Sequence, residues 1–424
     1  MINKNALKWI AWSLASFFYF YEYLLRVSPS IMVPELMNAF HVDAAALGLL
    51  SSFYFYSYAP MQLPVGLLID RFGAKKLLTL AASVCAIGAI LFGIAFHFWE
   101  AAFGRFLLGF GSSFAFVAMV YVCSHWFPKS KRALLVGLAN SIGMLGAFCG
   151  QGPLSSVLHE INWRVALIIL GILGFILSAV IYLTLKTDEP SKLSLASSHS
   201  IKDLFKGLMT ICKSRYTWIN AVIALFFYMT TTAIADLWGV PFLQSTYNLS
   251  KQTASFATSM IFIGWLVGGP IMGIISDKLK KRKAVIVWTI VFTICSLIPV
   301  IYLTNLPIFI IYILLFCVGF FSSGELLNFT LATELNSPHV KGSAIAFTNC
   351  IVSFGSGLIQ PVIGLFLDIT WNGTKLDGLN IYSTRDYQYA FSILPILLCL
   401  ALLLSSFLKE GKIKEHAIEP LSGD

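Results

Sequence analysis

The chain has 424 residues, of which 58% are hydrophobic and only 12% are charged, and its mean hydropathy is +0.80. A soluble domain typically carries about 25% charged residues, so this composition excludes an ordinary soluble protein. Apolar stretches of roughly 20 residues, each long enough to cross a bilayer as a helix, recur along the chain. The shorter alternating segments of a membrane β-barrel are absent from the sequence. We therefore expect an all-α polytopic membrane protein.

The hydropathy pattern predicts 12 transmembrane helices in two pseudo-symmetric six-helix bundles. In chain order the predicted spans cover about 8–31, 46–69, 77–97, 101–124, 133–158, 164–185, 217–241, 254–276, 284–304, 307–330, 342–366 and 388–408. The first span contains Glu22 and Arg26 and is too long to be a cleaved signal peptide.

Basic residues are distributed unevenly between the two sides of these spans. With the N-terminus inside, the outer segments hold only Arg164, Lys251, Lys375 and Arg385. The positive-inside rule then places both termini in the cytoplasm, and we expect the inner membrane of a bacterium. The net charge of +9 thus reflects topology and not nucleic-acid binding, and the lipid bilayer is the expected partner of the basic loops.

The chain divides into four predicted segments. These are the N-terminal bundle (1–185), a cytoplasmic linker (186–216), the C-terminal bundle (217–408) and a cytoplasmic tail (409–424). Within the linker, a Ser-rich run from Ser191 to Ser200 precedes residues 201–212, whose apolar and basic faces predict an amphipathic helix on the membrane surface.

Short motifs recur in the same order in both halves at a nearly constant offset. The segment that begins Gly66-x-x-x-Asp70 recurs as Gly273-x-x-x-Asp277, at the inner end of an apolar span. Further matching pairs are Val33-Pro34 with Val240-Pro241, Gly109 with Gly319, Asn140 with Asn349, Gly146 with Gly355, and Gln151 with Gln360. Such an internal repeat is typical of a secondary transporter whose site lies between the halves.

Charged residues inside the first span need a reason, because each costs roughly 3 kcal/mol or more in hydrocarbon. Glu22 and Arg26 are one helical turn apart, with Glu on the N-terminal side. One interpretation is a self-neutralising structural pair. The other makes Arg26 the anchor of a substrate anion, with Glu22 holding it or exchanging a proton. Tyr19, Tyr23 and Ser30 share a helix face with Arg26 and are further candidates for substrate binding.

The second half offers its own polar candidates within the predicted spans. Asp236 mirrors Arg26 and is interpreted as a gate, as the partner of a substrate ammonium group, or as an outer-end residue wetted by head-group water. Glu325 is the second candidate for proton coupling, with Asn328 one turn further on. Gln151 and Gln360 are either cavity donors or contacts between helices.

These motifs together resemble the major facilitator superfamily over essentially the whole chain. The family's loop signature is matched by Gly66, Leu68, Asp70, Arg71, Gly73 and Lys75, and its span-4 pattern by Arg105, Gly109 and Gly111. The resemblance implies alternating access, with spans 1, 4, 7 and 10 around a central cavity. It also implies that a conformational latch includes Gly66, Asp70, Arg71, Gly73, Asp277 and Arg105.

A finer resemblance is carried by the end of span 1. Arg26, Ser30 and Pro34 match the R-x-x-x-S-x-x-x-P pattern of organic anion:cation symporters, in which the Arg contacts a substrate carboxylate. Those symporters often carry Glu after the span-4 glycines, where this chain has Ser112. The layout is also similar to amino-acid and nutrient importers of intracellular bacteria. The antiporter signature of span 5 is incomplete, because Phe148 stands where Gly is expected.

We therefore expect a monomeric secondary active transporter that imports a small polar carboxylate-bearing solute by proton symport. An amino acid, a short peptide and an organic acid all fit as substrate. A proton-driven exporter of drugs or metabolites is the alternative, and a membrane enzyme or receptor is a more distant one. No P-loop, catalytic triad or metal-spaced His/Cys cluster is present in the sequence, so we expect no enzyme activity, metal or cofactor.

Overall fold

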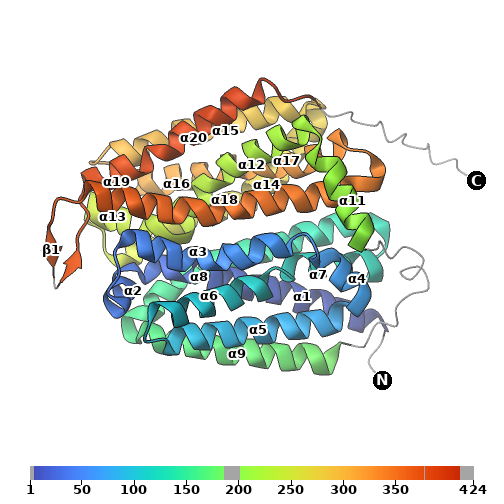
Figure 1. Ribbon diagram of the computed structural model, residues 1–424, viewed down its shortest axis with the longest axis horizontal. Coiled ribbons are helices and arrows are strands. Elements are labelled where there is room, and N and C mark those ends of the chain that lie inside the picture. The colour runs from blue at the N-terminus through green and yellow to red at the C-terminus, as the bar shows by residue number, and fades with distance from the viewer. Residues whose placement is uncertain (1–3, 186–200, 377, 411–424) are drawn as a thin grey trace, which may run out of the picture.

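The computed structural model describes residues 4–185, 201–376 and 378–410, and these residues are almost entirely helical (Figure 1). Helices of the first half are α1 (Lys4–Val27), η1 (Ser28–Ile31), α2 (Val33–Phe40), α3 (Ala44–Met61), α4 (Val65–Phe72), α5 (Ala74–Ile94), α6 (Phe98–Ser112), α7 (Ala115–Trp126), α8 (Lys129–Glu160) and α9 (Trp163–Thr184).

The second half follows the helix α11 (Ile201–Cys212). Its elements are α12 (Arg215–Ala233), η2 (Ile234–Trp238), α13 (Gly239–Tyr247), α14 (Lys251–Leu279), α15 (Arg282–Tyr302), α16 (Ile308–Ser322), η3 (Ser323–Glu325), α17 (Leu326–Leu335), η4 (Pro338–Val340), α18 (Lys341–Thr370), β1 (Lys375–Leu376), β2 (Leu379–Asn380), α19 (Thr384–Phe391) and α20 (Ile393–Ser405). The two strands pair antiparallel as a short hairpin.

Each predicted span is occupied by one helix or by consecutive helical elements, but the count of twelve transmembrane helices is not reached. Among the described residues, ten helices are long and apolar enough to cross a membrane, and an eleventh is counted only if α2 and α3, bent by 105°, form one span. The 24-residue α1 is not among them, because Glu22, Arg26 and several tyrosines lower its hydropathy.

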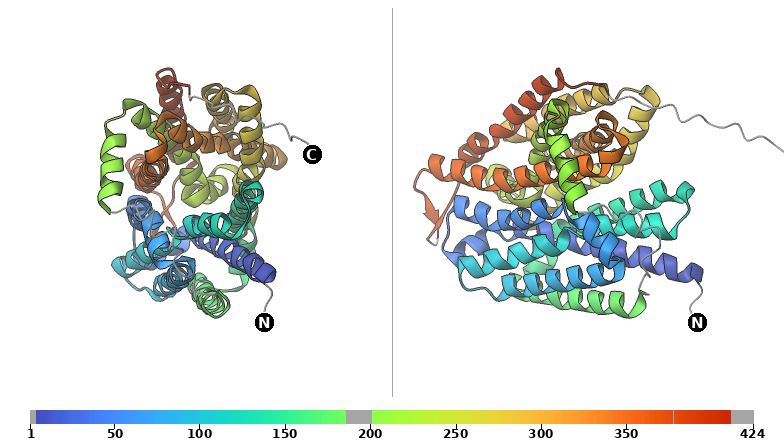
Figure 2. Two further views of the ribbon diagram at one scale, coloured as in Figure 1. Left: turned by 90° about the vertical axis from the view of Figure 1, so that its right-hand side faces the viewer. Right: turned by 45° about the vertical axis from the view of Figure 1, so that its right-hand side comes forward.

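The first-half helices lie together on one side of the molecule and the second-half helices on the other (Figures 1 and 2). Along the boundary, α3 packs against α18 and α8 packs against α14. Both ends of the described chain lie at the same end of the molecule as α4 and α11 (Figure 1).

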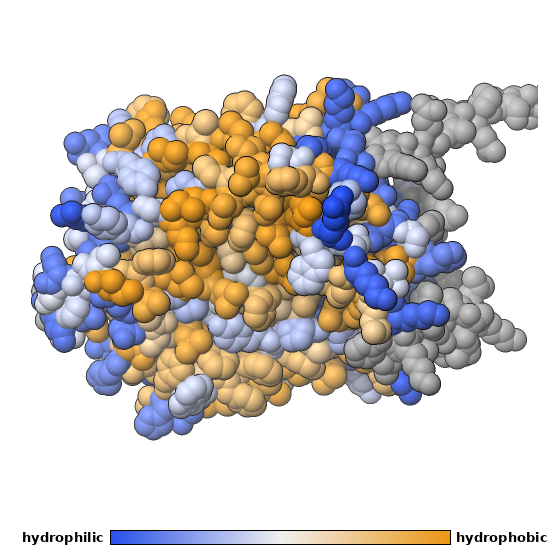
Figure 3. Space-filling model, turned by 45° about the horizontal axis from the view of Figure 1, so that its top comes forward, coloured by the Kyte–Doolittle hydropathy of each residue, from blue (hydrophilic) through white to orange (hydrophobic). Residues whose placement is uncertain are grey.

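The outer surface has the character of a protein embedded in a membrane. Apolar side chains cover its middle, while polar side chains gather at both ends (Figure 3). Large apolar side chains are exposed on many helices, among them Phe103, Leu173, Phe292, Phe309 and Leu403. A soluble monomer rarely exposes an apolar surface of this extent.

Repeated glycines allow equivalent close contacts in the two halves. A Cβ on Gly109 would stand 1.9 Å from the Tyr54 carbonyl oxygen, and one on Gly319 would stand 1.9 Å from the Ile261 carbonyl oxygen. In the first half α6 therefore approaches the backbone of α3, and in the second half α16 approaches that of α14, each at a place where only glycine fits.

The amphipathic helix predicted over 201–212 is present as α11, and it contacts other helices of the protein. It packs against α18 and η4, where a Cβ on Gly207 would stand 2.8 Å from the Ser343 hydroxyl oxygen. The Ser-rich run predicted for 191–200 lies outside the described residues.

Candidate functional site: a cavity between the halves

A cavity of about 940 Å³ lies between the two halves. Its wall runs from the buried Arg26 and the half-buried Tyr228 to the exposed Asp70, Lys206 and His339 near α4 and α11. The cavity therefore opens to solvent at the end of the molecule where α4 and α11 lie.

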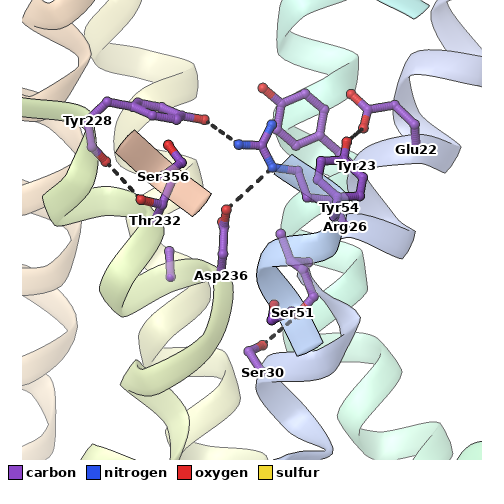
Figure 4. A network of polar contacts seen from close by, with 12 residues as sticks. Glu22, Tyr23, Arg26, Ser30, Ser51, Tyr54, Tyr228, Thr232, Asp236 and Ser356 are labelled. Carbon is purple, nitrogen blue, oxygen red and sulfur yellow. Dashed lines mark hydrogen bonds and ion pairs between the residues drawn. The ribbon is translucent and has the colours of Figure 1, made fainter. Parts of the chain in front are cut away.

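Arg26 stands where α1 ends and the chain turns through η1, a 3-10 turn containing Pro29. Its Nε lies 3.3 Å from Oδ2 of Asp236, and its NH2 group donates to the Tyr228 hydroxyl at 3.0 Å. Figure 4 shows Arg26 reaching across to these two residues, which belong to the second half. The guanidinium therefore joins the halves at the deep end of the cavity.

Aromatic rings surround the same guanidinium. The carbon at its centre lies 5.0 Å from the ring centroid of Phe55, 5.2 Å from Tyr23 and 5.6 Å from Tyr54. A cation within about 6 Å of a ring centroid is attracted by the negative face of the ring. These rings keep Arg26 in place without neutralising its charge.

Asp236 lies in η2, a π-helical segment that interrupts the span formed by α12 and α13. A π-helical turn inserts an extra residue and is frequent at functional sites. Asp236 is buried and pairs with Arg26, and it is not in the cavity lining. A position in head-group water, one of the interpretations above, is wrong.

Arg105 supports this arrangement from behind. Its guanidinium donates to the carbonyl oxygens of Leu25 and Arg26 at 3.4 Å, and to the Ser51 carbonyl at 3.3 Å. The last carbonyls of a helix lack partners within the helix, so Arg105 satisfies the end of α1. All these contacts lie within the first half.

Glu22 pairs with a tyrosine and not with Arg26. Its Oε2 accepts a hydrogen bond of 2.8 Å from the Tyr54 hydroxyl, and the self-neutralising pair with Arg26 is therefore not formed. Tyr54 stacks on Tyr58, which lines the cavity, so Glu22 lies one layer behind the wall.

Glu325 is the carboxylate of the second half that reaches the cavity. It ends the 3-10 turn η3, lines the wall and is only 2% exposed. Its Oε1 has no hydrogen-bond partner in the part of the chain that the structure describes.

The other predicted site residues divide between the wall and the protein interior. Tyr19 and Tyr23 line the cavity beside Arg26. Ser30, Gln151, Asn328 and Gln360 are buried and are not in its lining.

Gln151 crosses between the halves. Its amide nitrogen donates to the Ser30 hydroxyl at 2.8 Å and to the Ala235 carbonyl. Gln151 therefore forms a contact between helices of the two halves. This was the second of the two roles considered for it, and it does not donate into the cavity.

Two polar contributions to the wall were not predicted. Tyr228 holds Arg26, and its spacing from Asp236 by two helical turns places both on one face of the span. Asn349 donates to the Gln62 side chain at 2.7 Å across the halves. The match of Asn349 with Asn140 in the internal repeat was the signal for the second contact.

The halves meet closely at the end opposite the cavity mouth. The Asp368 carboxylate accepts hydrogen bonds from the backbone nitrogens of Ala44 (3.2 Å) and Ala45 (2.7 Å), at the start of α3. The Tyr382 hydroxyl donates to Asp368, and burial together with that carboxylate raises the pKa of Tyr382. We call Asp368, Tyr382 and the first turn of α3 the clasp.

A second contact closes the same end. Lys251 lies 2.6 Å from Glu35 and links α14 to α2. The clasp and this ion pair both join residues of opposite halves, so both must open before the cavity can reach this side.

The loop residues assigned to a latch lie at the open end. Arg282 pairs with Asp277 at 2.5 Å and with Glu334 at 3.2 Å, all within the second half. Cβ atoms added to Gly66 and Gly273 would meet no heavy atom within 4 Å, so these glycines make no close helix contact in this conformation. Gly73 has a φ of +78°, which explains the glycine between α4 and α5.

Three comparisons with known proteins agree with this architecture. The sequence matches the family described as Major Facilitator Superfamily over residues 14–358 and 237–422. The structure is similar to a bacterial homologue of the human lysosomal transporter Spinster in an inward-facing, unoccupied conformation. The TM-score is 0.77 and the identity 16%, over 95% of this chain and 96% of that one.

Curated relatives include bacterial transport proteins and membrane sensor proteins. A probable sulfoacetate transporter of Cupriavidus necator is 25% identical over 62% of this chain and 64% of its own length. A hexuronate transporter of Bacillus subtilis is 24% identical over 62% and 63%. The chain thus spans less than two thirds of these two relatives. A probable hexose phosphate transport protein of Chlamydia pneumoniae is 22% identical over 84% of both chains.

Family and fold are those of transporters and not of enzymes. The Spinster homologue and the family match together cover nearly the entire chain. The chain belongs to the major facilitator superfamily of transporters.

Proposed function

We propose that this protein is a secondary transporter that imports a small polar solute bearing a carboxylate, by proton symport with alternating access. The observation that carries the proposal is the position of Arg26. A buried guanidinium lies at the deep end of a 940 Å³ cavity, and its acidic partner comes from the opposite half. A planar guanidinium binds carboxylate and phosphate groups through two parallel hydrogen bonds.

The relatives support an anionic substrate. Their names specify sulfoacetate, hexuronate, galactarate or D-glucarate, and hexose phosphate. All of these named substrates are organic anions, and an arginine at the deep end of the cavity suits each of them. These substrates differ in the rest of their structure, and the feature that they share is a carboxylate or another oxyanion.

Substrate binding is proposed to loosen the junction between the halves. An incoming carboxylate takes the place of Asp236 on the Arg26 guanidinium, and the direct ion pair across the halves is lost. The clasp and the Lys251–Glu35 pair then remain as the contacts that hold the opposite end closed. Rocking of residues 1–185 against 217–408 exposes the same Arg26 to the other side.

Glu22 is the proposed proton carrier of the first half. A protonated carboxyl is neutral, so its burial costs far less than that of a carboxylate. Glu22 is 1% exposed, and Tyr54 and Tyr58 connect it to the cavity.

Orientation in the membrane follows from the basic loops. The open end holds both ends of the described chain and α11 (Figure 1). The positive-inside rule assigns the basic loops of the sequence to the cytoplasm. We therefore propose an inward-open state of a monomeric protein in the bacterial inner membrane.

The proposal is tested by ligand-induced thermal stabilisation of the purified protein. The probes are sulfoacetate, glucuronate, glucarate, glucose 6-phosphate and a set of amino acids. Stabilisation increases with ligand concentration over Kd. Arg26→Gln should remove the stabilisation by every compound that binds, and Arg26→Lys should retain part of it. The exposed Arg385→Gln is the matched control. Undiminished stabilisation of Arg26→Gln would contradict the anchor role.

A further inference from the structure

The cavity wall of the second half carries a feature that an anion carrier does not need. Glu325 lines the cavity, is 2% exposed, and its Oε1 has no hydrogen-bond partner among the described residues. A buried polar atom without a partner is costly, and a native structure usually provides one. We infer that Glu325 and the adjacent aromatic side chains form a binding subsite for the ammonium group of the substrate.

Three aromatic side chains of α12 and α14 line the cavity on the same half as Glu325. They are Tyr228, Phe262 and Trp265. The rings of Tyr228 and Trp265 meet edge to face, 5.6 Å between centroids and at 85°. Trp265 donates its indole N–H to the Thr231 hydroxyl at 3.2 Å, which fixes the ring.

Helix packing brings Glu325 to these rings. The turn η3 packs on α14, where a Cβ on Gly268 would stand 2.4 Å from the Ser323 hydroxyl oxygen. η3 also contacts α12. Glu325 therefore enters the cavity between the helices that supply Trp265 and Tyr228.

This combination recognises a specific chemical group. An ammonium ion gains from the negative face of an aromatic ring and from a charge-assisted hydrogen bond to a carboxylate. A purely anionic substrate would be repelled by Glu325 in its charged form. The subsite therefore selects for a positive group.

The two poles of the cavity lie in opposite halves. Arg26 belongs to α1, and Tyr228 contacts it at 3.0 Å while also belonging to the aromatic wall beside Glu325. A substrate with a carboxylate on Arg26 and an ammonium group at Glu325 bridges the halves. The inference rests on the proposed role of Arg26 and narrows the substrate to a zwitterion, such as an amino acid or short peptide. It also leaves Glu22 as the proton carrier.

The test uses ligand pairs that differ only in the ammonium group. Leucine is compared with 4-methylpentanoate, phenylalanine with 3-phenylpropanoate, and glutamate with glutarate. Apparent Kd values come from thermal stabilisation of the purified full chain over a concentration series. For at least one pair, the wild type should bind the amino acid at least tenfold more tightly, since hydrogen bonds to charged groups typically contribute that much.

Variants test whether the preference for the amino acid over its deaminated analogue depends on the subsite. Glu325→Gln, which keeps the shape of the side chain, should bring the ratio of Kd values near one. Trp265→Leu should lower the ratio at least threefold and serves if Glu325→Gln does not fold. Glu160→Gln, on an exposed side chain, should leave it unchanged.

The outcomes separate this inference from the proposed function. Equal affinity for both members of every pair in the wild type, or an unchanged ratio in Glu325→Gln, overturns the subsite. If the carboxylates and amino acids of these pairs still lose their binding in Arg26→Gln, the anchor role of Arg26 stands without the subsite. Binding that does not depend on Arg26 counts against both. No binding by any member of any pair overturns the subsite alone, because the organic anions named under the proposed function still test the anchor role.

Discussion

Arg26 and Asp236 are 210 residues apart in the chain and 3.3 Å apart in the structure, where they join the two halves at the deep end of the cavity. The pair occupies the place where a substrate anion would compete with Asp236 for the guanidinium. Binding and the closure of the junction are therefore linked through one side chain.

Asp236→Asn tests this competition. The substitution leaves the Arg26 charge without its acidic partner, and an unpaired buried group costs about 1–3 kcal/mol or more. We expect a lower melting temperature without ligand and a larger thermal stabilisation by a carboxylate ligand than in the wild type. Stabilisation smaller than that of the wild type would show that Asp236 helps to bind the carboxylate and does not compete with it.

The clasp predicts a shift in conformational populations. Asp368→Asn and Tyr382→Phe each weaken hydrogen bonds that the backbone nitrogens of Ala44 and Ala45 donate across the halves, and each bond contributes about 1 kcal/mol. We expect a rise of about fivefold or more in the population that is open at this end. Spin labels are placed at Asn38 and Lys375, both exposed, in a cysteine-free background. Double electron–electron resonance then reports the distance between the two halves at this end.

A matched control for the clasp is Tyr389→Phe. Tyr389 is exposed, and in the described part of the chain its hydroxyl is hydrogen-bonded only to Arg385. Its distance distribution should equal that of the wild type. Clasp variants that also retain the wild-type distribution would show that these bonds do not hold the end closed.

Glu22→Gln should separate transport from the proton gradient. The amide cannot carry a proton, yet it can still accept the hydrogen bond from Tyr54. We expect substrate exchange across proteoliposomes to persist while accumulation driven by a pH gradient is lost. Accumulation equal to the wild type would remove Glu22 from the coupling mechanism.

The repeated glycines give a prediction about stability. Gly109→Ala and Gly319→Ala each force a methyl group against a backbone carbonyl at 1.9 Å, and overpacking of this kind costs about 1–3 kcal/mol. Gly66→Ala and Gly273→Ala meet no atom within 4 Å and should keep the wild-type melting temperature. Equal losses in all four variants would contradict the repeat-based contacts.

The two open-end glycines carry a second expectation. If the latch forms when this end closes, Gly66→Ala should slow turnover while the affinity for ligand stays the same. A large loss of affinity would place Gly66 in the binding site.

Much of the fold was predictable because a bilayer demands long apolar helices. Every predicted span is occupied by one helix or by consecutive helical elements, and a helix over 201–212 is present. The sequence did not reveal the break between α3 and α4 or the π-helical segment around Asp236. Both depend on tertiary contacts, which hydropathy does not record.

The sequence identified several residues of the cavity wall but not the pairs that they form. Arg26, Tyr19, Tyr23 and Glu325 do line the cavity. Sequence spacing favoured Glu22 as the partner of Arg26, since the two are one helical turn apart. In the structure Arg26 instead pairs with Asp236, because α1 packs against η2 of the second half. Glu22 accepts its hydrogen bond from Tyr54 of α3, within the first half.

The most direct test of the central claim is uptake into proteoliposomes under an imposed pH gradient, acid outside. The radiolabelled probe is the carboxylate that stabilises the wild type most. The account predicts accumulation above equilibrium by the wild type and by Arg385→Gln, and no uptake by Arg26→Gln at equal protein content. Accumulation by Arg26→Gln at the wild-type rate would contradict the role of Arg26 as the substrate anchor.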